Sequence, residues 1–388
     1  MTTASKCTIR QQKAGRTLTK LIQQGQTIGI IGGGQLGQMM ALDAKQTGMK
    51  VIVLDPTPAC PAGQVADDQI VAEYADVSAI EELARRSDVL TYEFENVDLN
   101  ALKDVADQVY IPQGTHLLYT TKNRIREKTF LRDAGLQTAP VKDAADLKRA
   151  VAELGYPCVL KTCEGGYDGH GQEVLHSDAD LAKCTGILST RDAILEGWVP
   201  FELECSVMVG RNENGEVTVF PVAENIHHDE ILHISIIPAR ISPELQEKAQ
   251  QMAVQIAHAI DLRGILGVEM FIGRDGEIYI NELAPRPHNS GHYSIEACNF
   301  SQFAIHNRAV CNWPLPKIEL LKPAVMVNVL GQHVAGVREQ ISQKPNWHFH
   351  DYGKAAVRHN RKMGHVTILT DDVEQTLTEI DNTGIWSE

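Results

Sequence analysis

Two glutamates, Glu269 and Glu282, have a spacing that suggests metal chemistry. They flank the dipeptide Asp275-Gly276, which predicts a two-residue type I′ hairpin turn between two apolar runs. With that dipeptide as the loop, Glu269 and Glu282 face each other, and two like charges in that position destabilise a strand pair. Mg²⁺ takes carboxylate oxygens together with substrate phosphates, so a cation between them would relieve the repulsion. The pair predicts a metal site. The alternative is two solvated glutamates, which the apolar strands disfavour.

A polar loop follows the second glutamate. It holds Arg286, His288, Asn289, Ser290 and His292, five polar side chains within seven residues. Next to paired acids, this density predicts a loop that faces a substrate. A serine hydrolase is disfavoured because no Gly-x-Ser-x-Gly motif surrounds Ser290.

A glycine-rich segment at 165–171 follows Lys161, at the end of an expected strand. Glycine-rich backbone can approach phosphates closely, and a nearby lysine neutralises them. The segment is not a Walker A motif, which ends in Gly-Lys-Ser/Thr. A plain turn is the alternative, but ordering so many glycines costs entropy without a hairpin to serve.

Gly32, Gly34 and Gly37 form a G-x-G-x-x-G motif between an expected strand and helix, and Asp55 ends the next strand. This pattern resembles a dinucleotide fingerprint. The alternatives are tight strand-to-helix packing, or a substrate phosphate at the helix N-terminus. An NAD-dependent dehydrogenase is therefore a hypothesis from another class, but it leaves Lys161 and the paired glutamates without a role.

A basic cluster near the C-terminus stands out in a chain whose net charge is −14. It comprises Lys354, Arg358, Arg361 and Lys362. A phosphate-bearing substrate would explain it, and a solvated basic turn is the alternative. The overall acidity disfavours nucleic acid and anionic membranes as partners.

The order of elements predicts an α/β protein of several domains. Residues 27–120 alternate strands and helices in a way typical of a parallel sheet. We expect a second domain at 121–315, with a small lid subdomain at about 139–200, and a small C-terminal domain at 316–388. Expected helices span 76–86, 121–138, 143–154, 178–189 and 242–260. Asn214-Gly215 predicts another hairpin, which places Glu204 near Asn225 with His227 farther along the same face.

The eight cysteines are scattered without any CxxC pair, which favours reduced thiols in a cytoplasmic protein. The sequence has no run of 18 apolar residues, so no transmembrane helix is predicted. Residues 1–26 carry five basic residues and no acid. We expect a poorly ordered leader there, with a transit peptide as the alternative.

Five segments together resemble the ATP-grasp superfamily and, within it, the 5-(carboxyamino)imidazole ribonucleotide synthase family. They are IIGGGQLG (30–37), TYEFEN (91–96), GGYDGHGQ (165–172), NELAPRPHNSGHYSIEA (281–297) and YGKAAVRHNRKMGH (352–365). The resemblance covers residues 27–388. It implies an ATP-grasp fold with an N-terminal Rossmann-like (biotin-carboxylase-N-like) domain and a small C-terminal mixed domain.

The resemblance also implies a reaction. Family members use ATP and bicarbonate to carboxylate 5-aminoimidazole ribonucleotide through carboxyphosphate, giving ADP and phosphate in purine biosynthesis. A homodimer that binds only small molecules is expected. The runner-up is another ATP-grasp ligase, such as the formate-dependent glycinamide ribonucleotide transformylase. A non-catalytic nucleotide-binding regulator is disfavoured because both glutamates and Lys161 are present.

Residue roles follow from the same resemblance. ATP is expected to contact Arg124, Lys161, Glu204, His227, Asn281, the loop Gly166, Tyr167, Asp168, Gly169, His170, Gly171 and Gln172, and the adenine hinge Glu196, Gly197, Trp198 and Val199. Glu269 and Glu282 would bind Mg²⁺ (or Mn²⁺). Tyr167, Asp168, Arg286, His288 and Asn289 would face the aminoimidazole and bicarbonate. Gln35, Lys354, Arg361 and Lys362 would bind the ribonucleotide phosphate.

The chain departs from the family pattern at His170, where arginine or lysine is expected. A histidine keeps a hydrogen-bond donor but loses a fixed charge near neutral pH. We therefore expect closure of this loop to depend more strongly on pH than in the family.

Overall fold

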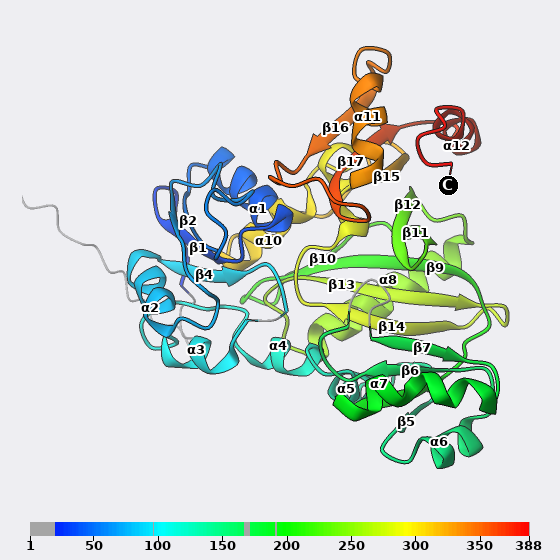
Figure 1. Cartoon of the computed structure of the whole chain (residues 1–388). Coiled ribbons are helices and arrows are strands. Elements are labelled where there is room, and N and C mark those ends of the chain that lie inside the picture. Colours follow the sequence, from blue (N-terminus) through cyan, green and yellow to red (C-terminus); the bar gives the residue numbers. More distant parts are fainter. Residues whose placement is uncertain (1–19, 96, 167–170, 191, 388) are drawn as a thin grey trace, which may run out of the picture.

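The computed structural model describes residues 20–95, 97–166, 171–190 and 192–387 (Figure 1). These residues form an N-terminal unit, a small lid, and a long central sheet that continues into the C-terminal region. In the described ranges no helix is long and apolar enough to cross a membrane.

The N-terminal unit is built on a four-stranded parallel sheet in the order β3-β2-β1-β4. Buried aliphatic side chains of β1 and β2 pack toward α1 on one side and toward α2 and α3 on the other. The expected βαβ pattern and the helix at 76–86 are confirmed. The bounds are β1 Thr27–Ile31, α1 Gln35–Gln46, β2 Lys50–Leu54, β3 Asp68–Ile70, α2 Val77–Arg86, β4 Val89–Tyr92 and α3 Leu99–Asp104.

Two short helices, α4 (His116–Thr121) and α5 (Arg124–Asp133), connect this unit to the lid. The helix expected over 121–138 is therefore shorter than predicted. Asn123 caps its start by accepting hydrogen bonds from the N–H groups of Ile125 and Arg126. Gly135, with a φ of +76°, ends it in a left-handed conformation.

The lid is an antiparallel sheet in the order β5-β8-β6-β7. The expected helix 143–154 begins only after its cap Asp146, because residues 141–143 form a strand. The expected helix 178–189 begins with a 3-10 turn. The bounds are β5 Val141–Asp143, α6 Leu147–Leu154, β6 Cys158–Thr162, β7 Gln172–Leu175, η1 Asp178–Cys184, α7 Thr185–Thr190 and β8 Ala193–Gly197.

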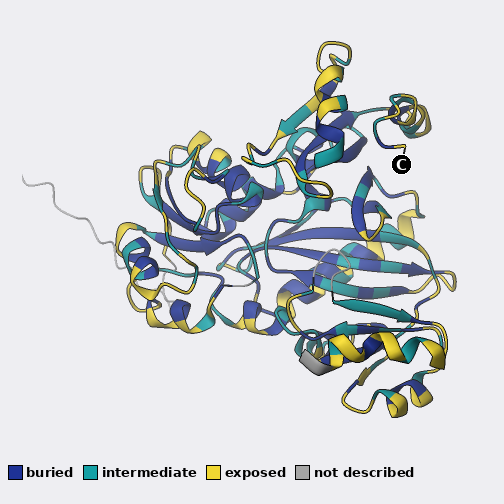
Figure 2. Ribbon diagram, in the orientation of Figure 1, coloured by how far each residue is buried: buried dark blue, intermediate teal, exposed yellow. Residues whose placement is uncertain are grey.

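The central sheet runs in the order β14-β13-β9-β11-β12-β15-β17-β16, with β10 paired to β9. Three of its strands come from the C-terminal region, so one sheet joins both parts of the chain. Most of its strand residues are buried (Figure 2). The bounds are β9 Phe201–Arg211, β10 Val217–Val219, β11 Ala223–His228, β12 Ile231–Ile237, β13 Gly264–Gly273, β14 Ile278–Ala284, β15 Ala324–Leu330, β16 Trp347–Asp351 and β17 Lys362–Leu369.

Helix α8 (Pro243–Ala259) covers one face of this sheet, as the expected helix 242–260 requires. Its Ala249, Ala253 and Ile256 pack with side chains of β9, β13 and β14 in one buried cluster. The opposite face is therefore left for the polar side chains described below. The remaining helices are η2 Asn289–Gly291, α9 Ser294–Ala297, α10 Gln302–Val310, η3 Gly331–His333, α11 Val334–Gln340 and α12 Val373–Asp381.

The β13–β14 turn differs from the predicted one. Gly273 N–H donates to the Glu277 carbonyl (2.8 Å) and Gly276 N–H donates to the Gly273 carbonyl (2.9 Å), which makes a three-residue loop. Of the loop residues, Gly276 has a positive φ (+76°) and Asp275 does not. The type I′ prediction was wrong, because that turn needs positive φ at both central residues.

A bulge nevertheless restores the predicted pairing of the glutamates. Next to the turn, Ile272 pairs with Ile278 and Met270 with Ile280, one residue out of the expected register. The register then shifts, leaving Asn281 as an extra residue, and Glu269 pairs with Glu282. Two deviations from the predicted hairpin therefore cancel.

The second hairpin repeats this loop geometry. Asn212 N–H donates to the Glu216 carbonyl (3.1 Å), and Gly215 has a φ of +86°. Farther along, Asn225 pairs with Glu204, as predicted.

Candidate active site

Glu269, Asn281 and Glu282 lie on the sheet face opposite α8. Val268 and Met270 on β13 belong to the buried cluster under α8, so Glu269 between them points the other way. On β14, Ile280 and Leu283 belong to that cluster. The two residues between them, Asn281 and Glu282, both avoid the core because the bulge interrupts the alternation.

Each paired glutamate contacts a basic side chain of the protein. Glu269 Oε1 lies 2.9 Å from His288 Nε2, and Glu282 Oε2 lies 3.0 Å from Arg124 Nη1. Burial alone would raise the pKa of Glu269, but the charges of His288, His227 and Lys362 outweigh it and lower the pKa to about 2. Glu269 is therefore a carboxylate at neutral pH.

Two buried residues of α5 that the sequence analysis did not single out hold β14. Glu127 Oε2 accepts a hydrogen bond from Leu283 N–H (3.1 Å), and Lys128 Nζ donates to the Asn281 carbonyl. The two residues are 2% and 1% exposed. Their spacing from Arg124, three and four positions, is a usable signal because it places all three on one helix face.

The Glu196 carboxylate contacts two lysines. Its carboxylate lies 3.3 Å from Lys128 Nζ and 2.7 Å from Lys161 Nζ. Burial opposes ionisation, but Lys128 and Lys161 lower the pKa of Glu196 to about 2. This cluster brings Lys161 of the lid next to α5.

The expected adenine hinge lies at the end of β8. Gly197 N–H donates to the Pro140 carbonyl (2.8 Å) and Trp198 N–H to the Pro157 carbonyl (3.2 Å). These two donors are used within the lid, so a bound base would need other backbone groups of residues 196–199. The Trp198 side chain is 44% exposed and is not a core residue.

Glu204 and His227 form a pair on neighbouring strands of the same face. Glu204 Oε2 lies 3.4 Å from His227 Nδ1. Burial favours the neutral ring, but the carboxylates of Glu204 and Glu269 outweigh it and raise the pKa of His227. The structure thus extends the polar face from Glu282 to Glu204.

The polar loop after Glu282 is only partly a substrate-facing surface. Ser290 and His292 are both fully buried, so the prediction was wrong for these two residues. Ser290 Oγ lies 2.9 Å from His288 Nδ1 and accepts from Ser206 Oγ (2.6 Å). Asn289 Nδ2 is buried and has no hydrogen-bond partner within the described ranges.

The glycine loop of the N-terminal unit already holds protein carboxylates. Gly34 N–H and Gly37 N–H donate to Glu93 at 2.6 Å and 2.8 Å, and Gly33 N–H donates to Asp55 (2.8 Å). Burial raises the pKa of Glu93 to about 7, although the two glycine amides and Arg286 act in the opposite direction. The hydrogen-bond acceptor at this helix N-terminus is therefore a carboxyl group of the protein itself. The dehydrogenase hypothesis loses the free amides and the free Asp55 carboxylate that it needs.

The C-terminal cations approach this region from the other side. Lys354 Nζ donates to the Lys362 carbonyl (2.7 Å), and Arg361 Nη1 donates to the Ala356 carbonyl (2.8 Å). Burial and the neighbouring Arg361 lower the pKa of Lys354 to about 8, while Glu93 acts against this shift. Arg358 is exposed, as expected for a solvated basic residue.

Arg286 and Gln35 complete the set of described candidates. Arg286 Nη2 lies 2.7 Å from Glu95 Oε1, and Glu93 and Glu282 also raise the pKa of Arg286 against its burial. Gln35 is the first residue of α1 and is half-buried beside Gly34. Three regions of the chain thus place cations near Glu93 and Glu282, namely Arg124, Arg286 and Lys354.

Part of the glycine-rich loop lies outside the described residues, namely Tyr167, Asp168, Gly169 and His170. Its two ends are described. Gly171 has a φ of +81°, and a Cβ there would lie 2.7 Å from Thr162 Oγ1, so glycine is required. Lys161 pairs with Gln172 across the two strands that carry the loop. The loop therefore starts and ends next to Lys161.

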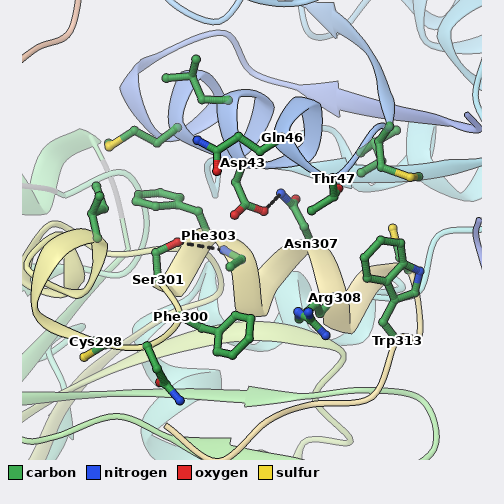
Figure 3. A pocket seen from close by; sticks show the side chains of 18 of the residues that line it. Asp43, Gln46, Thr47, Cys298, Phe300, Ser301, Phe303, Asn307, Arg308 and Trp313 are labelled. Carbon is green, nitrogen blue, oxygen red and sulfur yellow. Dashed lines mark hydrogen bonds between the residues drawn. The ribbon is translucent and has the colours of Figure 1, made fainter. Parts of the chain in front are cut away.

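A separate cavity of about 590 Å³ lies between α1 and α10 (Figure 3). Asp43 accepts a hydrogen bond from Asn307 at its wall (2.8 Å), and the Arg308 guanidinium lies 4.7 Å from the centre of the Phe300 ring. None of the candidate residues named above lines this cavity. The cavity is therefore distinct from the face that carries Glu269 and Glu282.

Comparison with known families agrees with this organisation. Residues 25–120 match the ribonucleotide synthetase preATP-grasp domain, 129–303 the ATP-grasp domain, and 324–379 the phosphoribosylaminoimidazole carboxylase C-terminal domain. The chain is 50% identical to the N5-carboxyaminoimidazole ribonucleotide synthase of Bacillus subtilis (strain 168) over 366 residues, 94% of this chain and 96% of the relative. The chain belongs to the N5-carboxyaminoimidazole ribonucleotide synthase family.

Solved structures of this synthase family have the same fold. An ADP complex of N5-carboxyaminoimidazole ribonucleotide synthetase is 53% identical, with a TM-score of 0.93 over 95% of this chain and 99% of that one. The Aspergillus clavatus synthase in complex with ADP and 5-aminoimidazole ribonucleotide is 33% identical, with a TM-score of 0.87 over 92% and 97%. The expected ATP-grasp fold is confirmed, and the chain is an ATP-dependent ligase of purine biosynthesis.

Proposed function

We propose that this ligase carboxylates 5-aminoimidazole ribonucleotide with bicarbonate, using ATP, on the sheet face that carries Glu269 and Glu282. The observation that carries the proposal is the direct pairing of these two glutamates, with Lys161 on one side and the C-terminal cations on the other. Bicarbonate would attack the γ-phosphorus of ATP to give carboxyphosphate, and the substrate amine would then take the carboxyl group.

The donor set fits a divalent cation. Two carboxylates project from directly paired positions, and Asn281 shares their face because of the bulge. Oxygen ligands and substrate phosphates are what Mg²⁺ prefers. Glu269 and Glu282 would hold the ion, with Mn²⁺ as an alternative. When bound, it would neutralise charge on the phosphates during transfer.

The nucleotide would lie between the lid and the central sheet. Lys161 and Arg124 are cations within this region, and each now contacts a carboxylate that a phosphate could replace. We assign the glycine-rich loop to cover the phosphates, residues 196–199 to the adenine, and Glu204 with His227 to the ribose. Catalysis would rest mainly on positioning and charge neutralisation.

The acceptor and bicarbonate would lie next to the polar loop. Asn289 Nδ2, which has no hydrogen-bond partner among the described residues, is a buried donor that bicarbonate could satisfy. Arg286 and His288 flank it, and we add Tyr167 and Asp168 from the resemblance. Lys354, Arg361 and Lys362, with Gln35, would bind the ribonucleotide phosphate. A homodimer and a cytoplasmic location complete the proposal; the location is supported by described cysteines that are all free.

The reaction is tested by measuring ADP release with 5-aminoimidazole ribonucleotide and bicarbonate together. We expect turnover that needs both. Turnover with formate and glycinamide ribonucleotide instead would support the transformylase alternative. Oxidation of NADH without ATP turnover would overturn the assignment of the site.

The metal assignment is tested with Glu282→Gln, which keeps the shape of the side chain. We expect kcat to fall by at least about 100-fold while the melting temperature stays within a few degrees. A large fall in melting temperature with retained turnover would instead make the glutamate pair structural.

A further inference from the structure

Strand β14, which carries Glu282, lies at the edge of the central sheet. Among the residues that the structure describes, its outer backbone groups have no partner strand apart from an isolated bridge between Thr138 and Ile280, in which Ile280 N–H donates to the Gln137 carbonyl (2.8 Å). The bulge at Asn281 also interrupts its pairing with β13. An edge strand with a bulge has few constraints of its own on the direction of Glu282.

Helix α5 supplies constraints on both sides of Glu282. Lys128 Nζ donates to the carbonyl of Asn281, the residue before it, and Glu127 Oε2 accepts from the N–H of Leu283, the residue after it. The same helix sends Arg124 to the Glu282 carboxylate (3.0 Å). Three side chains on one helix face therefore hold three consecutive residues of β14.

This arrangement is costly as a packing solution. A buried glutamate and a buried lysine each lose hydration, and apolar residues of similar volume often stabilise a core better. Glu127 Oε1 is buried and has no hydrogen-bond partner within the described ranges. A function other than stability would explain why a carboxyl group and an ammonium group are used here.

We propose that Glu127 and Lys128 are positioning residues that fix the bulge of β14 and so aim Glu282 at the metal and the nucleotide phosphates. This inference rests on the metal role proposed above for Glu282. Lys128 also lies against Glu196, which contacts Lys161. Lys128 therefore links strand β14 to the lid. Neither residue needs to touch the substrate.

A pair of variants separates positioning from charge. Glu127→Gln keeps the length and one oxygen acceptor for Leu283 N–H, whereas Glu127→Met keeps the length without any acceptor. ADP binding is measured by calorimetry with Mg²⁺ and again with EDTA. For Glu127→Met we expect EDTA affinity within about twofold of wild type and at least a tenfold loss of the gain that Mg²⁺ provides. Glu127→Gln should keep that gain within about threefold.

The hydrogen-bonded state of Leu283 gives a second readout without a nucleotide. Hydrogen exchange of the peptide covering 278–284 should be slow in wild type and in Glu127→Gln, and at least tenfold faster in Glu127→Met. If Glu127→Met does not fold, Lys128→Met removes the hydrogen bond to the Asn281 carbonyl and is tested by the same two measurements. Fast exchange of Leu283 in the wild type would by itself contradict the proposal.

Two results for the Glu127 variants would overturn the proposal. Equal losses in Glu127→Gln and Glu127→Met would overturn positioning, because the hydrogen bond to Leu283 N–H, which only Glu127→Gln keeps, would then not matter. An intact Mg²⁺ gain in Glu127→Met would also overturn it. Glu282→Gln is measured alongside. If it keeps the full gain in ADP affinity from Mg²⁺, the proposed metal role of Glu282 fails. If it loses that gain while Glu127→Met keeps it, only the positioning role of Glu127 and Lys128 fails.

Discussion

Glu93 is a carboxyl group whose proton is coupled to stability. Burial raises its pKa from 4.5 to about 7, so between these values the folded chain holds a proton that the unfolded chain releases. The free energy of unfolding should therefore fall by about 3 kcal/mol through this group as the pH rises from 4.5 to 7. Denaturant unfolding of wild type and Glu93→Gln at several pH values measures it. Equal slopes in the two proteins would contradict the prediction.

Lys354 should make substrate affinity depend on pH. Its pKa is lowered to about 8, so above pH 8 the free enzyme loses a charge that we assign to the ribonucleotide phosphate. The KM for 5-aminoimidazole ribonucleotide should rise about tenfold per pH unit above 8. Lys354→Arg stays charged and should flatten the profile between pH 7 and 9. A rise of the same size in both proteins would assign the effect to another group.

At the scale of elements, the β13–β14 turn depends on one glycine. Gly276 is exposed, has a φ of +76°, and a Cβ there would meet no atom within 4 Å. Gly276→Ala should therefore cost about 1 kcal/mol through backbone strain alone. Gly276→Asn, which tolerates this conformation, should cost less, and thermal unfolding compares the two. Equal melting temperatures for all three proteins would show that the turn tolerates any residue.

The sequence predicted these elements better than their details. Asp275-Gly276 marked the hairpin, and the apolar runs on both sides of it indicated strands that are not freely exposed. The turn type could not be read from the dipeptide, because a three-residue loop also needs a glycine at its last position. The pairing of Glu269 with Glu282 was correct only because the bulge at Asn281 offset that error. Glu127 and Lys128 were missed because their partners are backbone groups of a distant strand.

At the scale of the whole molecule, a buried polar contact joins the N-terminal unit to the rest. Asn307 of α10 donates to the Met40 carbonyl (2.9 Å) and to Asp43 (2.8 Å) of α1. Asn307→Leu should destabilise the protein by about 1–3 kcal/mol, because it leaves the buried Met40 carbonyl and the half-buried Asp43 without their donor. Adding Asp43→Leu should recover part of that loss, as calorimetry can show. A double variant that is worse by the sum of both changes would argue against coupling.

The joining of the regions was beyond sequence reasoning. The sequence predicted a small C-terminal domain at 316–388, and these residues do carry their own helices, η3, α11 and α12. Yet β15 pairs with β12. The sequence did not predict this pairing, because hydrogen bonding between strands is set by backbone geometry and leaves little trace in the side-chain pattern. The basic cluster could be recognised in the sequence. Its proximity to Glu93 and Glu269 could not be predicted, because it depends on how the strands pair.

That shared sheet limits how the chain can be shortened. Removing residues after about 315 would strip β15 from β12 and leave the apolar segment Ile231–Ile237 as an unprotected border. Unpaired strands of this kind recruit one another between molecules. A truncated ATP-grasp fragment should therefore precipitate or self-associate during refolding, and a soluble version would need charged residues introduced on β12.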